Sequence, residues 1–392
     1  MKRTRTLTLA ATTVLAGISL SPNTALAQVV GNDVIAALNT QLSYQGGSLS
    51  GGSVSTNGDT VVVTGATLSL ADEEDGFAIS ELTFSGVEAD GSGGYNVATI
   101  TMPAFEVNDS GTAAAIGGIT ITDYKIAAAD ETDPIVRSGL FKTMTTGPIT
   151  VSEGGQQGFS IAGVAVEVGD YQPGATWTSS VAVTDFELDT SVLEDPQASQ
   201  TMAALGYETL TGDITANGVW DAASGNMGFE NFVLSVDDAA AIGLDFALGG
   251  YTVELVEAMQ QINATAENDQ AAGMAMLGLM QQLEIQGAAI KITDTSLTNK
   301  LLEFFGQQQG TNADGMRAFA KGMLPLGLAQ LQSPEFAAKA TAAVGSFLDN
   351  PGTLVIEAQP AQAIPVMQLA APLMSGNPSA LIDALSLDIR AE

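Results

Sequence analysis

Apolar and polar residues alternate along the chain from Gly46 to about Tyr251. Successive side chains of a strand point to opposite faces of a sheet, so this period of two predicts β-strands with one apolar face. The clearest example is FVLSVDDAAAIGLDFAL, residues 232–248, in which Asp237 and Asp238 separate two alternating runs. Clusters of Gly, Asn, Asp and Ser punctuate the other runs, as is typical of turns between antiparallel strands.

After this region the apolar residues recur at helical spacing. Met274, Leu277 and Met280 share one side of a predicted helix. Ser333-Pro334-Glu335 is a typical helix start, because it combines an N-cap acceptor, a proline in the first turn and an acid near the positive helix end.

Isolated strands within this helical region indicate how the two parts are joined. Short alternating runs lie at residues 288–292, 353–357 and 387–390, and a lone strand needs a sheet to pair with. We therefore expect an α+β fold: a large twisted antiparallel β-sheet structure in a β-rich domain, residues 28–251, followed by a helix-rich portion with a few strands, residues 252–392, that packs on or beside the sheet and is integrated with it.

The first 27 residues have the pattern of a secretory signal peptide. Lys2, Arg3 and Arg5 precede a short apolar run, and Ala25-Leu26-Ala27 fits the small-residue pattern that predicts cleavage after Ala27. The expected location is the periplasm or the exterior. No later stretch is apolar for 18 consecutive residues, so we do not expect an integral membrane protein.

Charge and composition exclude several partners and chemistries. Cleavage after Ala27 leaves 9 basic and 44 acidic residues, a formal net charge of −35, which repels nucleic acid. The chain contains no histidine and no cysteine, so Ser-His-Asp and Cys-His catalysis and zinc sites built on these residues are excluded. We expect no catalytic residue, no metal ligand and no cofactor. Two-carboxylate glycoside hydrolysis stays formally open, but acids such as Glu230 or Asp245 do not stand out.

Two acidic clusters raise the question of calcium. Asp72-Glu73-Glu74-Asp75-Gly76 and Asp130-Glu131-Thr132-Asp133 are dense in carboxylates, but neither has the spacing of a known calcium loop. We interpret both as solvated turns, with calcium stabilisation as the alternative.

The apolar face of the 232–248 hairpin must be covered, either by the protein itself or by a guest. Burial of each large apolar side chain is worth about 1.5–3 kcal/mol. One interpretation is a closed core beneath the methionine-rich helices. The other is a groove between sheet and helices that binds an apolar ligand, with candidate residues Phe232, Leu234, Val236, Leu244, Phe246, Leu248, Met274, Leu277 and Met280.

Two stretches resemble known families. The hairpins in GDITANGVWDAASGNMGFENFVLSVDD resemble those of secreted Gram-negative envelope proteins, and the tail IEAQPAQAIPVMQLAAPLMSGNPSALIDALSLDIRAE is similar to that of uncharacterised secreted alphaproteobacterial proteins. The hairpin style also resembles AsmA-type envelope proteins, which implies a long curved sheet and lipid handling.

These observations favour a periplasmic, non-enzymatic protein that binds a lipid-like ligand or an envelope partner. The alternative is a structural or interaction protein with a closed core and an acidic, calcium-stabilised surface.

Overall fold

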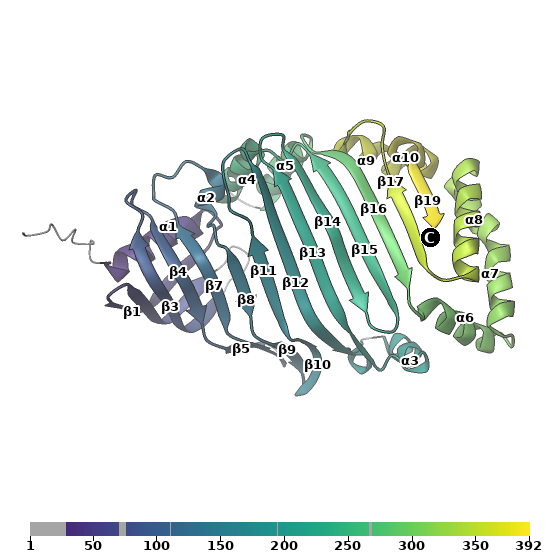
Figure 1. Ribbon diagram of the computed structural model, residues 1–392, viewed down its shortest axis with the longest axis horizontal. Helices are drawn as coiled ribbons and strands as arrows, with labels where there is room; N and C mark the ends of the chain where they lie inside the picture. The colour runs from purple at the N-terminus through teal and green to yellow at the C-terminus, as the bar shows by residue number, and fades with distance from the viewer. Residues whose placement is uncertain (1–28, 70–75, 110, 194, 266–268) are drawn as a thin grey trace, which may run out of the picture.

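The computed structural model describes residues 29–69, 76–109, 111–193, 195–265 and 269–392, and the expected cleavage site at Ala27 lies outside them. Within these residues the strands join in one large antiparallel sheet that is not closed on itself (Figure 1). The mixed fold with a large antiparallel sheet, predicted from the sequence, is confirmed.

The strands lie mainly in the first three quarters of the chain, with three more near the C-terminus. Their bounds are β1 (Ser48–Asn57), β2 (Thr60–Ser69), β3 (Phe77–Ala89), β4 (Tyr95–Met102), β5 (Phe105–Asp109), β6 (Thr112–Ile116), β7 (Ile119–Ile126), β8 (Thr143–Thr146), β9 (Ile149–Glu153), β10 (Gln156–Ile161), β11 (Gly163–Val168), β12 (Thr176–Asp189), β13 (Thr209–Asp221), β14 (Asn226–Val236), β15 (Ala240–Gly249), β16 (Glu284–Asp294), β17 (Thr353–Ala358), β18 (Ile364–Pro365) and β19 (Leu387–Ala391).

Most of the helices follow β15. Their bounds are α1 (Gly31–Ser43), α2 (Pro134–Arg137), α3 (Pro196–Ala204), α4 (Val253–Thr265), α5 (Asp269–Met280), α6 (Leu297–Gln308), α7 (Ala313–Leu328), α8 (Pro334–Asp349), α9 (Val366–Ser375) and α10 (Pro378–Leu385). The helix predicted to start at Ser333-Pro334-Glu335 is confirmed, because α8 begins at Pro334.

Pairing runs almost in chain order across the sheet. The main run is β1–β2–β3–β4–β7–β8–β11–β12–β13–β14–β15–β16–β17–β19. A branch, β5–β6–β9–β10, joins the main run at β12, and β18 pairs with β16. The strands β16, β17 and β19 of the helix-rich part thus extend the sheet built by the earlier strands, and β16, with 11 residues, is longer than the run at 288–292 that the sequence indicated.

The helices gather at the ends of the sheet. In Figure 1, α1 lies at the N-terminal end, α4 and α5 lie at one end of the central strands, and α6–α8 lie beyond β19. Polar side chains fix α1 in place: Asn39 both donates to the Leu49 carbonyl (2.9 Å) and accepts from the Leu49 N–H (2.6 Å). Gln41 bonds the backbone of Lys125 and Ala127 in the same way, at 3.3 Å each. These bonds join α1 to β1 and to the end of β7.

Candidate ligand-binding face

Apolar side chains lie opposite one another, strand after strand, on one side of the sheet, which we call the apolar face. From β11 to β19, one row of directly paired residues contains Val164, Val183, Ile214, Leu234, Ile242, Ile292, Leu354 and Ala391. From β2 to β13, a second row contains Val61, Phe84, Ile100, Ile121, Met144, Val166, Val181 and Ala216. Both rows pass through β11, two residues apart, so the apolar face is continuous across the sheet.

Helix α1 covers the N-terminal end of the apolar face. Its Val34 and Leu38, one helical turn apart, are buried against Val61, Phe84 and Ile100 in a single hydrophobic cluster. Burial of each such side chain is worth about 1.5–3 kcal/mol. This end of the sheet therefore has a conventional helix-on-sheet core.

Helix α8 covers the C-terminal end of the same face. Ala340, Ala343 and Phe347 are buried in a cluster with Leu354 of β17 and Ile389 of β19. The two alanines allow the helix to approach the sheet closely, and Phe347 fills the space beside them. The cluster reaches Ile292 of β16 and goes no further toward the centre of the sheet.

Between these two covers, large apolar side chains remain exposed. We call this region the open apolar face, and it consists of Val164, Val166, Val181, Val183, Ile214, Phe229, Phe232, Leu234, Ile242, Leu244, Phe246 and Ile290. Five of these side chains are 37–47% exposed: Val181, Phe229, Ile242, Leu244 and Ile290. A contiguous exposed apolar surface of this kind marks an interaction site in soluble proteins.

The structure brings the strand residues predicted from the hairpin together. Register pairs Phe232 with Leu244, and Leu234 with Ile242, on the apolar face. On the same face lie Val236, opposite Ala240, Phe246, opposite Phe229, and Leu248, opposite Met227.

The structure places the three predicted helix residues elsewhere. Met274, Leu277 and Met280 lie on α5, and they are 69%, 56% and 37% exposed. Their helix packs on α4. A closed core of hairpin and methionine-rich helix does not form, because α5 leaves its apolar side chains in solvent and Ile242 and Leu244 remain exposed as well.

An aromatic cluster, which sequence reasoning missed, lies at one end of β12 and β13, two of the strands that carry the open apolar face. Tyr171, Trp177, Trp220 and Tyr251 form a chain of edge-to-face contacts with ring centroids 5.6–6.3 Å apart. Trp177 pairs with Trp220 across β12 and β13, and Val256 of α4 packs on the cluster. The two tryptophans are separated by 43 residues in the sequence, so only the strand register could reveal the contact.

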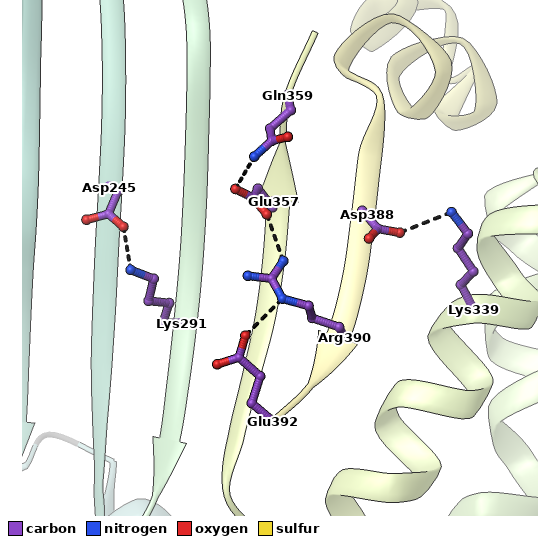
Figure 2. Close-up of polar contacts among 8 residues, drawn as sticks. All are labelled: Asp245, Lys291, Lys339, Glu357, Gln359, Asp388, Arg390 and Glu392. Atoms are coloured by element: carbon purple, nitrogen blue, oxygen red, sulfur yellow. Dashed lines mark hydrogen bonds and ion pairs between the residues drawn. The ribbon is translucent and has the colours of Figure 1, made fainter.

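The opposite face of the same strands carries charges. Figure 2 shows Lys291 bonded to Asp245 across β15 and β16 (2.7 Å), and Arg390 bonded to Glu357 (2.7 Å) and Glu392 (2.9 Å). At the edge of the sheet, Lys339 of α8 reaches Asp388 of β19 (3.1 Å). These strands therefore have one apolar and one polar side, and an apolar ligand would bind to the apolar side.

Asp245, one of the acids considered for glycoside hydrolysis, is held as a carboxylate. Burial raises its pKa, but the hydrogen bond from Lys291 and the N–H of Asn231 more than offset this effect, so the pKa lies below its usual value. A general acid requires the reverse shift. The geometry of Asp245 is that of a structural ion pair.

The two acidic clusters of the sequence are residues 72–76 and 130–133. Residues 72–75 lie outside the described part of the chain. Asp133 accepts from the N–H of Ile135 at the start of α2 (2.9 Å) and from the Tyr171 hydroxyl (2.9 Å), and Glu131 accepts from the N–H groups of Thr132 and Asp133. Among the described residues, no group of three acidic side chains is arranged to hold a metal ion.

In the described part of the chain, no helix has both the length and the apolar character needed to cross a membrane. Residues 233–392 are similar to a protein family described as "Uncharacterized protein". None of the curated proteins matches the chain. The similarity begins within β14, so it includes the C-terminal half of the open apolar face together with its α8 cover.

Proposed function

We propose that this protein, exported to the periplasm or beyond, binds an apolar or amphipathic, lipid-like ligand on the open apolar face and catalyses no reaction. One observation carries the proposal: a continuous row of apolar side chains crosses the sheet, and it is left exposed between the cores formed by α1 and α8. In this proposal the two helices close the ends of the binding face rather than its middle.

The exposed area supplies part of the driving force for binding. Burial of a large apolar side chain yields about 1.5–3 kcal/mol, so covering the roughly two fifths that remains exposed yields about 0.6–1.2 kcal/mol per residue. The five exposed residues Val181, Phe229, Ile242, Leu244 and Ile290 together offer about 3–6 kcal/mol. This corresponds to about two to four powers of ten in affinity before the cost of ordering the ligand.

The side chains available support binding rather than catalysis. Histidine and cysteine are absent from the whole chain, and the open apolar face consists of hydrocarbon side chains. Asp245, a carboxylate of the central strand β15, lies on the opposite face in its ion pair with Lys291. This surface can bind a partner through shape complementarity and apolar contacts.

Native mass spectrometry of the full-length protein, purified from its own host under gentle conditions, tests the proposal. We expect a bound species with the mass of a lipid, released by organic solvent, and a polypeptide that begins at Gln28. A clean ligand-free mass would contradict lipid binding. A co-purified protein on the same face would instead support an envelope partner as the occupant.

A further inference from the structure

The open apolar face continues into a cavity beneath α1. This α1 cavity has a volume of about 250 Å³ and lies between Leu38 and Leu42 of α1 and the apolar face of β1–β4, β7 and β8. Its floor includes Phe84, Ile100 and Met144, which belong to the second apolar row. Met144 pairs in turn with Val166 of the open apolar face, so the cavity and the open face share one surface.

The walls of the cavity restrict what it can hold. All its lining residues are hydrocarbon or thioether side chains except Tyr124. Burial raises the pKa of Tyr124 to about 12, so its phenol is neutral at physiological pH. A charged or strongly polar group would lose its hydration there without a matching partner, which costs several kcal/mol. The cavity therefore suits an uncharged, apolar end of a molecule.

The dimensions allow an acyl chain to extend from the cavity onto the open apolar face. One water molecule needs roughly 10–15 Å³ of cavity volume, so a cavity of about 250 Å³ has room for several methylene groups. The cavity borders β8, and the hydrophobic cluster under α8 begins at β16. The seven strands from β8 to β16 are separated by six spacings of about 4.8 Å, so they span about 29 Å. One lipid acyl chain spans about 15 Å, half of a bilayer core.

We propose that the α1 cavity receives the methyl end of a linear acyl chain, and that the rest of the chain lies along the open apolar face toward Val181 and Ile214. This inference rests on the proposed function and assigns its ligand class: lipids with an extended acyl chain, bound tail-first beneath α1. The polar head group stays over the open face, where water can reach it.

The absence of native cysteine makes the orientation of the chain measurable. A single bimane fluorophore is attached to Met144→Cys on the β8 side of the cavity, or to Ile214→Cys on the open apolar face, in the secreted protein. Ile214 lies three strands further along the sheet, about 14 Å away at about 4.8 Å per strand. Methyl stearate with a nitroxide at C16 or at C5 then quenches whichever label it approaches. We expect the C16 nitroxide to quench the Met144→Cys label at least threefold more than the C5 nitroxide does, and the preference to reverse at Ile214→Cys.

The outcomes separate the two proposals. Quenching at Ile214→Cys with none at Met144→Cys, or stronger quenching of the Met144→Cys label by C5 than by C16, would overturn the tail-first inference and leave the open face as the binding site. No quenching of either label by either probe would count against the proposed function itself.

A cavity-filling substitution gives a second test. Ile121→Trp fills the cavity, and Thr120→Trp places the same side chain on the opposite face of β7. We expect Ile121→Trp to weaken binding of methyl stearate at least fivefold and Thr120→Trp to leave it unchanged. Unchanged binding by a folded Ile121→Trp protein would refute the inference, and the label experiment decides if that variant does not fold.

Discussion

Replacing Leu244 with aspartate places a carboxylate in the middle of the open apolar face. Leu244 is 38% exposed, and it lies between Phe232 and Ile290 on the neighbouring strands. Because most of the side chain is already packed against these neighbours, its loss should cost about 1–2 kcal/mol of folding stability. A protein of this size should tolerate that cost and remain folded.

The effect on binding should be larger. A ligand over Leu244 buries the exposed two fifths of the side chain, worth about 1 kcal/mol. The new aspartate must in addition be covered without a hydrogen-bond partner, and even a neutral polar group loses about 1–3 kcal/mol in this way, which sets the lower bound for a carboxylate. The sum, about 2–4 kcal/mol, predicts affinity that is about 30- to 1,000-fold weaker.

Fluorescence titration with cis-parinaric acid measures this change. The control is Ala241→Asp, which adds the same charge to the same strand but on the polar face, opposite Ser235 and Thr293. We expect Ala241→Asp to bind like the unmodified protein. Equal losses in the two variants would mean that added charge, rather than the apolar face, controls binding, and no loss in either would refute the proposed site.

Four further predictions concern folding stability and the effect of calcium. Phe347→Ala should lower the unfolding free energy by about 3–5 kcal/mol in urea denaturation, because Phe347 is buried between α8 and the sheet. As the control, Phe319→Ala on the exposed side of α7 should lower it by less than about 1 kcal/mol. Gly212→Ala should cost at least about 1–3 kcal/mol by the same assay, since an added Cβ would collide with the backbone carbonyl of Ser235; a neutral effect would show that β13 and β14 can separate. The pKa of Tyr124 is about 10 in the unfolded chain and about 12 in the folded protein. Its neutral phenol therefore contributes about 2–3 kcal/mol to the free energy of unfolding below pH 10, and this contribution is lost as the pH rises to 12. The Tyr124→Phe protein should therefore lose less unfolding free energy between pH 10 and pH 12 than the unmodified protein does. Calcium and chelator should give the same melting temperature by differential scanning calorimetry, and a shift of many degrees would favour the calcium-stabilised alternative.

The sequence determined the local structure well, because local structure depends on local periodicity. Alternation between residues 232 and 248 placed Phe232, Leu234, Leu244 and Phe246 on one face, and register confirms that they share it. The start of α8 followed from the Ser333-Pro334-Glu335 signal, in which Pro334 and Glu335 act within the first turn, although the Ser333 side chain makes no cap hydrogen bond.

What covers each apolar surface was decided by the tertiary structure. The apolar spacing of Met274, Leu277 and Met280 predicts a helix side, but spacing does not state which surface that side meets. In the fold α5 packs on α4 and leaves these residues exposed, while α8 supplies the sheet cover through Ala340 and Phe347.

The continuity of the apolar face also lies beyond local pattern. Each strand shows its own alternation, but the alignment of Ile121 with Met144, and of Ile292 with Leu354, depends on pairing between segments that are 23 and 62 residues apart. Sequence therefore determined which side of each strand is apolar. Only the long-range register, and the positions of α1 and α8 that follow from it, decided that these sides join into one surface, covered at both ends and open in the middle.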